Sequence, residues 1–135
     1  MSQNSLNHRR TALITGASAG IGRDLAHVFA ENGFDLVLIA RREERLQALA
    51  QEVKGKFDTT AHILAMDLTD PDAGQKIEDH LTSADINVDA LVNNAGFTVT
   101  GLFKDSPWQD QADLIQVMVT SVAEFCHRFA PGMAE

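Results

Sequence analysis

Short, unbroken apolar runs alternate along the chain with longer segments in which apolar residues recur every three or four positions. The runs cover residues 12–14, 36–40, 62–66 and 90–93, the third beginning with a polar residue, His62, and the fourth ending with one, Asn93. Unbroken runs of this length are typical of parallel strands that are covered on both faces, and the longer segments have the spacing of amphipathic helices. Four strands in alternation with four helices predict an α/β fold with right-handed crossovers.

The apolar spacing also predicts which face each helix buries. The expected buried positions are Ile21, Leu25, Val28 and Phe29 in the first helix, Leu46, Leu49, Ala50 and Val53 in the second, Ala73, Ile77 and Leu81 in the third, and Leu114, Met118, Val122, Phe125 and Phe129 in the last.

Capping and turn residues predict where these helices begin and end. Asn32-Gly33, Gly55 and Pro131-Gly132 are expected to end the first, second and last helices. Asp70 with Pro71 is expected to begin the third helix, and the segment 106–109 has the form of a capping box for the last one. Trp108 is expected to be a packing residue at the start of that helix.

A glycine-rich turn, Thr15-Gly16-Ala17-Ser18-Ala19-Gly20-Ile21-Gly22, joins the first strand to the first helix. Backbone N–H groups and the positive end of the helix dipole favour an anion at such a junction, and glycine lets it approach the main chain. Strand, turn and helix in this order predict a site for the pyrophosphate of a dinucleotide. Gly16, Ser18, Ala19, Gly20 and Ile21 are the expected contacts, whereas Gly22 is expected to permit close helix packing.

Composition narrows the possible partners. The 135 residues carry a formal net charge of −8, which disfavours a nucleic-acid or anionic-membrane partner. Cys126 is the only cysteine, and the five histidines show no metal-binding spacing, so we expect a cytoplasmic protein without a metal site. Residues 1–10 are polar and are expected to form a flexible lead-in without a signal peptide, and residues 11–135 a single domain.

A second motif, Asn93-Asn94-Ala95-Gly96, follows the fourth strand. Together with the TGxxxGxG turn at 15–22, it makes residues 10–133 similar to the N-terminal part of the short-chain dehydrogenase/reductase family. The resemblance implies a Rossmann-type sheet with helices on both faces, in the order 3-2-1-4 and cut off after four strands. It also implies a nicotinamide cofactor and, in complete members, hydride transfer between that cofactor and an alcohol or carbonyl.

The end of the second strand indicates which nicotinamide cofactor to expect. Proteins that bind NAD usually place an acid there, but this chain reads Ala40-Arg41-Arg42. A guanidinium group can hold a 2′-phosphate through charge-assisted hydrogen bonds, which favour NADP over NAD by about 10- to 150-fold. The alternative is that Arg41 and Arg42 form a solvated helix start that pairs with Glu43 and Glu44.

The remaining cofactor contacts follow from the resemblance. It implies that Asp67 accepts a hydrogen bond from the adenine amino group, that Leu68 packs beside the ring, and that Asn93, Ala95 and Gly96 lie along the riboses. Asp67 could instead serve only to form a turn. The asparagines could tie strand ends together, and Asn94 is the better candidate for that architectural role.

The resemblance also shows which catalytic groups are missing. Family members use a Tyr general acid, a Lys in YxxxK register, a Ser and an Asn, whereas this chain has no tyrosine and places Met118 at the Asn position. We therefore expect no catalytic residue here, and either the NADP(H)-binding part of an oxidoreductase or a non-catalytic NADP(H)-binding or interaction module. A homo-oligomer through the last helix or the open edge of the fourth strand is also expected.

Overall fold

The four apolar runs form one parallel sheet with the strand order β3-β2-β1-β4. The computed structural model describes residues 8–134. The strands are β1 (Thr11–Thr15), β2 (Asp35–Ala40), β3 (Ala61–Ala65) and β4 (Ala90–Val92), and the α-helices are α1 (Gly20–Glu31), α2 (Glu43–Phe57), α3 (Ala73–Ser83), α4 (Trp108–Ile115) and α5 (Ser121–Met133). The predicted order 3-2-1-4 and the predicted strands are confirmed, with strand ends displaced by one residue.

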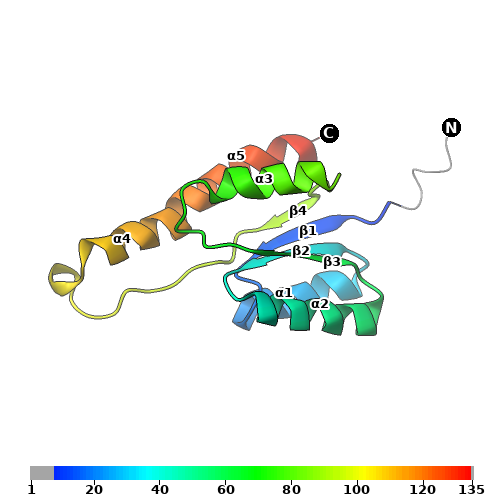
Figure 1. Cartoon of the computed structure of the whole chain (residues 1–135), viewed down its shortest axis with the longest axis horizontal. Helices are drawn as coiled ribbons and strands as arrows, with labels where there is room; N and C mark the ends of the chain where they lie inside the picture. Colours follow the sequence, from blue (N-terminus) through cyan, green and yellow to red (C-terminus); the bar gives the residue numbers. More distant parts are fainter. Residues whose placement is uncertain (1–7, 135) are drawn as a thin grey trace.

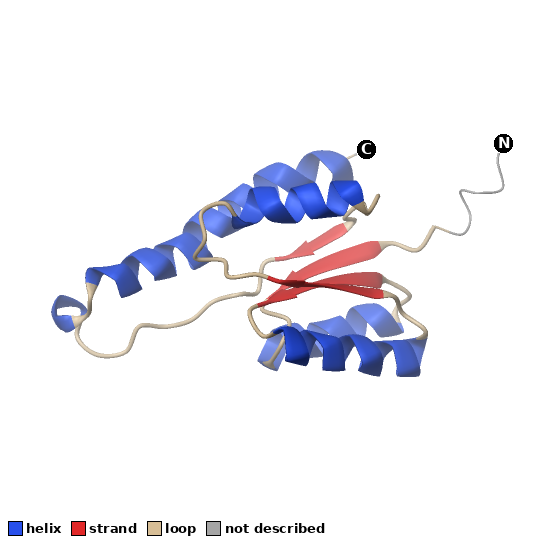
Figure 2. Ribbon diagram, in the orientation of Figure 1, coloured by secondary structure: helices blue, strands red, loops and turns tan. Residues whose placement is uncertain are grey.

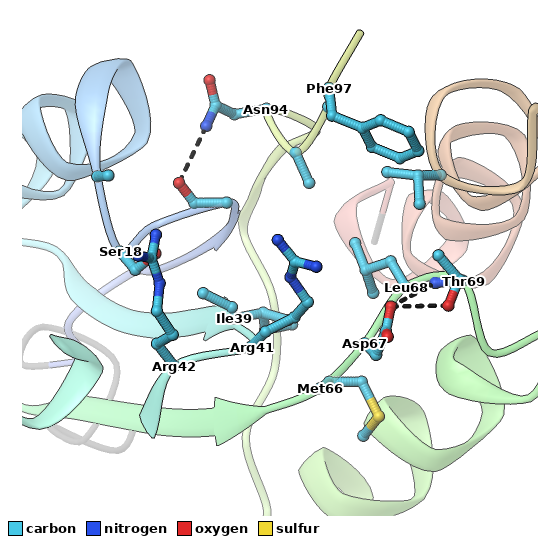
Figure 3. A pocket seen from close by; sticks show the side chains of 16 residues that line it. Ser18, Ile39, Arg41, Arg42, Met66, Asp67, Leu68, Thr69, Asn94 and Phe97 are labelled. Atoms are coloured by element: carbon cyan, nitrogen blue, oxygen red, sulfur yellow. Dashed lines mark hydrogen bonds between the residues drawn. The ribbon is translucent and has the colours of Figure 1, made fainter. Parts of the chain in front are cut away.

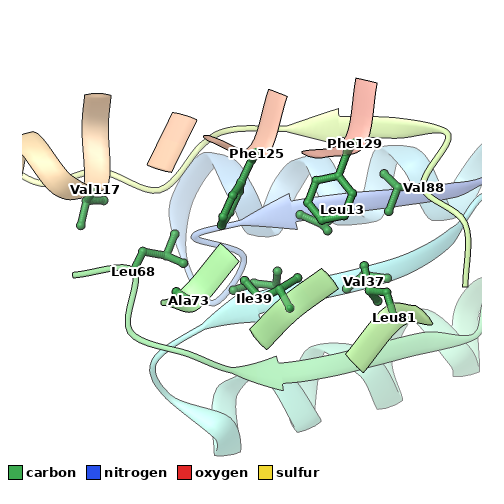
Figure 4. Packing of buried hydrophobic residues seen from close by; sticks show 11 residues of the cluster. Leu13, Val37, Ile39, Leu68, Ala73, Leu81, Val88, Val117, Phe125 and Phe129 are labelled. Atoms are coloured by element: carbon green, nitrogen blue, oxygen red, sulfur yellow. The ribbon is translucent and has the colours of Figure 1, made fainter. Parts of the chain in front are cut away.

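Helices cover both faces of the sheet, α1 and α2 on one and α3 and α5 on the other (Figures 1 and 2). Side chains along β1 and β2 alternate between two cores because successive residues of a strand point to opposite faces. Leu13, Val37 and Ile39 pack toward α3 and α5, together with Phe125 and Phe129 (Figure 4). The intervening strand residues pack toward α1 and α2. The Rossmann-type layering that the sequence implied is therefore present.

The first helix buries its predicted face only in part. Leu25 and Phe29 are half-buried and pack against the core, but Ile21 and Val28 are 72% and 52% exposed. The fully buried positions are Gly22, Ala26 and Ala30, which are spaced four apart and carry almost no side chain, so α1 can lie close against the sheet. The prediction was wrong at Ile21 and Val28 because it weighted large apolar side chains over the small ones that allow close packing.

The last helical segment is interrupted by a π-helix, η3 (Gln116–Thr120), between α4 and α5. The buried positions are Val117, Ser121, Phe125 and Phe129, with a constant spacing of four. The predicted stripe is therefore correct at the two phenylalanines and wrong at Met118, which is 45% exposed. The wider π turn shifts the register by one residue, and α4 extends beyond the sheet (Figure 1).

Three predicted helix ends differ from those in the structure. α3 begins at Ala73, because the Asp70 carboxylate accepts a hydrogen bond from Asp72 N (2.9 Å) in a local turn instead of capping the helix. α2 continues past Gly55 to Phe57 and ends at Asp58, which adopts a left-handed conformation. α5 continues through Pro131 to Met133, although proline inside a helix removes one backbone hydrogen bond.

The predicted capping box at 106–109 does not form. Ser106 Oγ donates a hydrogen bond to Phe103 O (2.9 Å), in the short 3₁₀ helix η2 (Phe103–Asp105), and the N-cap position of α4 is Pro107. Trp108 is 69% exposed, so its expected packing role is wrong.

Part of the expected lead-in makes defined contacts. Residues 1–7 lie outside the described part of the chain. Arg9 forms an ion pair with Asp35 (3.1 Å), and the Arg10 guanidinium carbon lies 4.4 Å from the centroid of the Phe34 ring. Within residues 8–134, no helix combines the length and apolar character that crossing a membrane requires.

Candidate cofactor-binding site

The glycine-rich turn leaves β1 at Thr15 and enters α1 at Gly20. Gly16 (φ +65°) and Gly20 (φ +58°) adopt left-handed backbone conformations, which side chains other than glycine rarely tolerate. Within the described residues, no side chain caps the N-terminus of α1, and its first turn holds no acid. The N–H groups and dipole of this turn are therefore available to an anion.

Close contacts around the turn exclude larger residues. A Cβ atom added to Gly22 would lie less than 3.0 Å from Gly16 O and from Asn94 Nδ2, and one added to Gly16 would lie 2.9 Å from Ala95 Cα. The expected role of Gly22 in close packing is therefore confirmed. Its contacts are the glycine turn itself and the segment after β4.

The ends of β1 and β4 are tied together by Thr15 and Asn94. The Thr15 hydroxyl accepts hydrogen bonds from the N–H groups of Asn94 and Ala95, both at 3.0 Å, and Thr15 is only 2% exposed. The Asn94 side chain donates to the carbonyl oxygens of Thr15 (3.1 Å) and Gly16 (3.3 Å). The architectural role predicted for Asn94 is thus confirmed, and this network fixes the glycine turn against the segment 94–96.

A cleft of about 300 Å³ opens at the carboxyl end of the strands, beside this network (Figure 3). Four predicted groups of residues line it: the glycine turn, the arginine pair, the loop after β3 and the segment after β4. The predicted residues that line it are Gly16, Ser18, Ala19, Arg41, Arg42, Asp67, Leu68, Ala95 and Gly96, and the structure adds Ile39, Ala40, Met66, Thr69, Asn94, Phe97 and Val117.

Three predicted contact residues are not part of this lining. Gly20 and Ile21 belong to the first turn of α1, where the Ile21 side chain is largely exposed. Asn93 directs its amide toward α5, where Nδ2 lies 3.5 Å from Cys126 Sγ. Cofactor contact by these residues remains a prediction.

Arg41 and Arg42 follow directly from the end of β2, and both are exposed at the cleft (Figure 3). Within the described residues, neither guanidinium group lies within 4.0 Å of a carboxylate, although Glu43 and Glu44 come next in the chain. The alternative in which the arginines pair with these glutamates is therefore not what the structure shows. Both guanidinium groups are free to meet an anion.

The loop after β3 supplies the opposite wall. Asp67 Oδ1 accepts hydrogen bonds from Thr69 N (3.0 Å) and Thr69 Oγ1 (2.8 Å), so this aspartate does form a turn. Asp67 also lines the cleft, and only its Oδ1 is engaged in these bonds. The turn therefore leaves Oδ2 available to a ligand.

Asp70, three residues further on, holds an ion pair at the base of this loop. Lys76 Nζ lies 2.7 Å from Asp70 Oδ2. This hydrogen bond, together with one from Asp72 N, lowers the pKa of Asp70, while the same carboxylate raises the pKa of Lys76. The pair joins the loop to the first turns of α3.

The lining residues that sequence reasoning missed are mostly neighbours of predicted ones. Ile39, Ala40, Met66 and Thr69 lie next to predicted positions at two strand ends, so their place on the chain could have identified them. Val117 is different, because only the π turn brings it to the cleft. Met118, expected from the resemblance at the position of the family Asn, lies against the main chain of Gly96: its Cε would be 3.2 Å from a Cβ added there.

A parallel sheet with a glycine-rich turn, an arginine pair and a cleft at the strand ends defines a Rossmann-type dinucleotide-binding fold. The profile of the "short chain dehydrogenase" family matches residues 10–135. The chain therefore belongs to the short-chain dehydrogenase family of oxidoreductases.

Sequence relatives include several reductases. The chain is 36% identical to sulfoacetaldehyde reductase 2 of Chromohalobacter salexigens over 124 residues, which are 91% of this chain and 48% of that protein. It is 32% identical to the human very-long-chain 3-oxoacyl-CoA reductase over 128 residues, 92% of this chain and 40% of the relative. The chain thus spans less than half the length of these two relatives.

Solved structures show the same fold. L-sorbose reductase of Gluconobacter frateurii, complexed with NADPH and L-sorbose, superposes with a TM-score of 0.86 at 30% identity, over 93% of this chain and 48% of that one. A short-chain dehydrogenase of Sphingobium yanoikuyae in complex with NADPH superposes with a TM-score of 0.81 at 37% identity, over 90% and 47% of the two chains.

Proposed function

We propose that this chain binds NADP(H) in the cleft and is the nucleotide-binding part of an oxidoreductase. The observation that carries the proposal is the presence of Arg41 and Arg42, without carboxylate partners among the described residues, in the same cleft as the glycine turn. A net charge of −8 makes such a local cationic pair the natural contact for a phosphate. The family reaction is hydride transfer between NADP(H) and an alcohol or carbonyl.

The residues of the cleft fit the parts of this cofactor. The turn at 16–21 offers backbone N–H groups to the pyrophosphate, and side chains at Gly16 and Gly22 would clash with the segment 94–95 and with the turn itself. Asp67 and Leu68 would receive the adenine, while Ala95 and Gly96 would lie along the riboses; Asn93, whose amide points toward α5, would reach them only through its main chain. When bound, the cofactor would supply hydride chemistry through its nicotinamide ring, and these residues would hold its pyrophosphate, adenine and riboses.

The arginine pair favours NADP over NAD. A 2′-phosphate would meet one or both guanidinium groups, whereas the hydroxyl of NAD would leave them without an anionic partner. Charge-assisted hydrogen bonds contribute about 1.5–3 kcal/mol, or about 10- to 150-fold in affinity. The NADPH complexes of two related structures support this preference.

Calorimetric titration of the chain with NADPH and with NADH tests the proposal. NADPH should bind about 10- to 150-fold more tightly than NADH. Arg41→Asp should remove most of that preference. Arg45→Asp is the matched control, because Arg45 is an exposed cation of α2 that does not line the cleft. It makes the same change in charge only a few residues away.

Three results would contradict the proposal in different ways. An unchanged preference in Arg41→Asp would move the 2′-phosphate contact elsewhere. An equal loss of NADPH preference in Arg41→Asp and Arg45→Asp would mean that the arginines act by long-range attraction and not by contact. A well-folded chain that responds to neither nucleotide would leave only a structural or interaction role.

We propose as a second candidate that the 135-residue chain binds the cofactor without turning over a substrate. The sequence contains no tyrosine to act as the family general acid, and Met118 replaces the family Asn. A positioned general acid contributes about 10²–10⁴ in rate. NADPH oxidation should therefore stay at background with a panel of aldehydes and ketones, and any carbonyl-dependent oxidation would overturn this candidate.

We also propose that copies of the chain associate. Within the described residues, no strand pairs with the outer edge of β4. Large exposed apolar side chains lie on the segment 97–119, including Phe103 (73%) and Val119 (59%). Open edges and exposed apolar surface both favour association.

A further inference from the structure

Ser121, the first residue of α5, is a polar residue that the fold buries. It is 4% exposed, and its hydroxyl donates a hydrogen bond to the carbonyl oxygen of Leu68 at 3.3 Å. Leu68 belongs to the loop between β3 and α3 that forms one wall of the cleft. The bond therefore ties that wall to a helix distant in sequence.

The π-helix η3 gives Ser121 this position. Val117 and Ser121 both face the core, in the same four-residue spacing as Phe125 and Phe129. Val117 lines the cleft and belongs to the same apolar cluster as Leu68 (Figure 4). The helix register that buries Val117 against the loop thus also places the Ser121 hydroxyl next to the carbonyl oxygen of Leu68. π turns often occur at functional sites.

The other polar contacts of the loop connect it to itself and to α3, the helix that follows it. Asp67 bonds to Thr69, Asp70 bonds to Asp72, and the partner of Asp70 on α3 is Lys76. Within residues 8–134, the hydrogen bonds of residues 67–72 stay inside the loop or reach α3, with the Ser121–Leu68 bond as the exception. That bond joins the loop to α5, a helix distant in sequence.

We propose that Ser121 is a positioning residue for the adenine end of the cleft, holding Leu68 and its neighbour Asp67 in the place where they receive the ring. The inference rests on the proposed binding of NADP(H). Without the hydroxyl, the loop moves among more positions and the ligand must order it on binding, which lowers affinity. The turn at 16–21 and the arginine pair stay in place, since neither contacts Ser121.

Ser121→Ala tests this role, with Thr59→Val as the matched control. Thr59 is also a buried hydroxyl that donates to a carbonyl, that of Ala30 at 3.4 Å, and it does not line the cleft. Loss of one hydrogen bond should weaken NADPH binding about fivefold in Ser121→Ala, measured by calorimetry. Thr59→Val should bind NADPH like the unsubstituted chain.

Amide hydrogen exchange without ligand gives a second readout, one that a general loss of stability would not reproduce. Exchange at the Thr69 and Asp70 amides should rise about fivefold in Ser121→Ala and remain unchanged in Thr59→Val. This measurement is independent of whether NADPH binds.

The outcomes separate this role from the proposed function. NADPH binding and loop exchange that are both unaltered in Ser121→Ala would overturn the role of Ser121 alone. Equal loss of affinity in the two variants would overturn it as well. If the unsubstituted chain binds no NADPH, the proposed function fails and the positioning role fails with it, whatever the exchange data show.

Discussion

At the scale of single residues, Gly22 is where the glycine turn is most constrained. We expect Gly22→Ala to lower the free energy of unfolding by about 1–3 kcal/mol, because the added methyl group overpacks the contact with Gly16 and Asn94. Alanine favours a helix more than glycine does, so the effect runs against helix propensity. Urea denaturation measures it.

Gly55→Ala is the control for this substitution. Gly55 also lies inside a helix, but a Cβ added there would meet nothing within 4 Å. Alanine should therefore stabilise the chain by about 0.5–1 kcal/mol. If the two substitutions changed stability in the same direction, the tight contact at Gly22 would not exist in solution.

Thr15 is the second residue on which the site depends. Thr15→Val keeps the shape of the side chain but leaves the N–H groups of Asn94 and Ala95 without their acceptor. Each unsatisfied donor costs about 1–3 kcal/mol, so we expect a loss of about 2–6 kcal/mol for the two in urea denaturation. Thr59→Val removes a hydroxyl that donates to Ala30 O and accepts from the partly exposed Arg9 guanidinium, both at 3.4 Å, and should cost about 1 kcal/mol. A smaller loss at Thr15 than at Thr59 would contradict the tie between β1 and β4.

At the scale of elements, the strands could be predicted from the sequence and the helix faces only in part. Each strand is an apolar run covered by helices on two sides, and that pattern is local. The buried face of α1 consists of Gly22, Ala26 and Ala30, small residues that let the helix approach the sheet closely. The register of α5 depends on a π turn, for which apolar spacing gives no signal.

The π turn η3 carries one residue more than a regular helical turn needs. Deleting Val119, which is exposed, should convert it to α-helix while α4 and α5 keep their packing. We expect such a deletion to cost about 1 kcal/mol or less. Deleting Ala123 from the regular helix α5 instead rotates Phe125 and Phe129 away from the core, at about 1.5–3 kcal/mol for each buried side chain.

Thermal unfolding of the two deletion variants measures this difference. The Val119 deletion should stay folded with a melting temperature near that of the unsubstituted chain, and the Ala123 deletion should be strongly destabilised. Equal destabilisation would show that the π turn is required and not merely accommodated.

At the scale of the whole molecule, the cleft gathers residues from five separate segments. Four of them could be predicted because they follow strand ends, and the ends of parallel strands meet at one edge of the sheet. Val117 could not, since it reaches the cleft from the π-helix η3. For the asparagine motif, the sequence predicted that Asn94 ties the strand ends together. It did not predict that Asn93 directs its amide to α5.

Association of copies should depend on the apolar segment 97–119. The double substitution Phe103→Glu with Trp108→Glu replaces two of the most exposed apolar side chains of this segment. If these side chains are buried on association, each contributes about 1.5–3 kcal/mol, so their loss should raise the dissociation constant at least about 100-fold. Sedimentation equilibrium over a range of concentrations measures that constant.

The control is Ile21→Glu with Val28→Glu, two exposed apolar residues of α1, outside the segment. Both double variants add the same two negative charges to a chain that already carries a net charge of −8, so general repulsion is matched. Association that weakens only in the first variant assigns the contact to the segment 97–119. Association that persists in both would leave the open edge of β4 as the contact, and a chain that is monomeric at every concentration would exclude both surfaces.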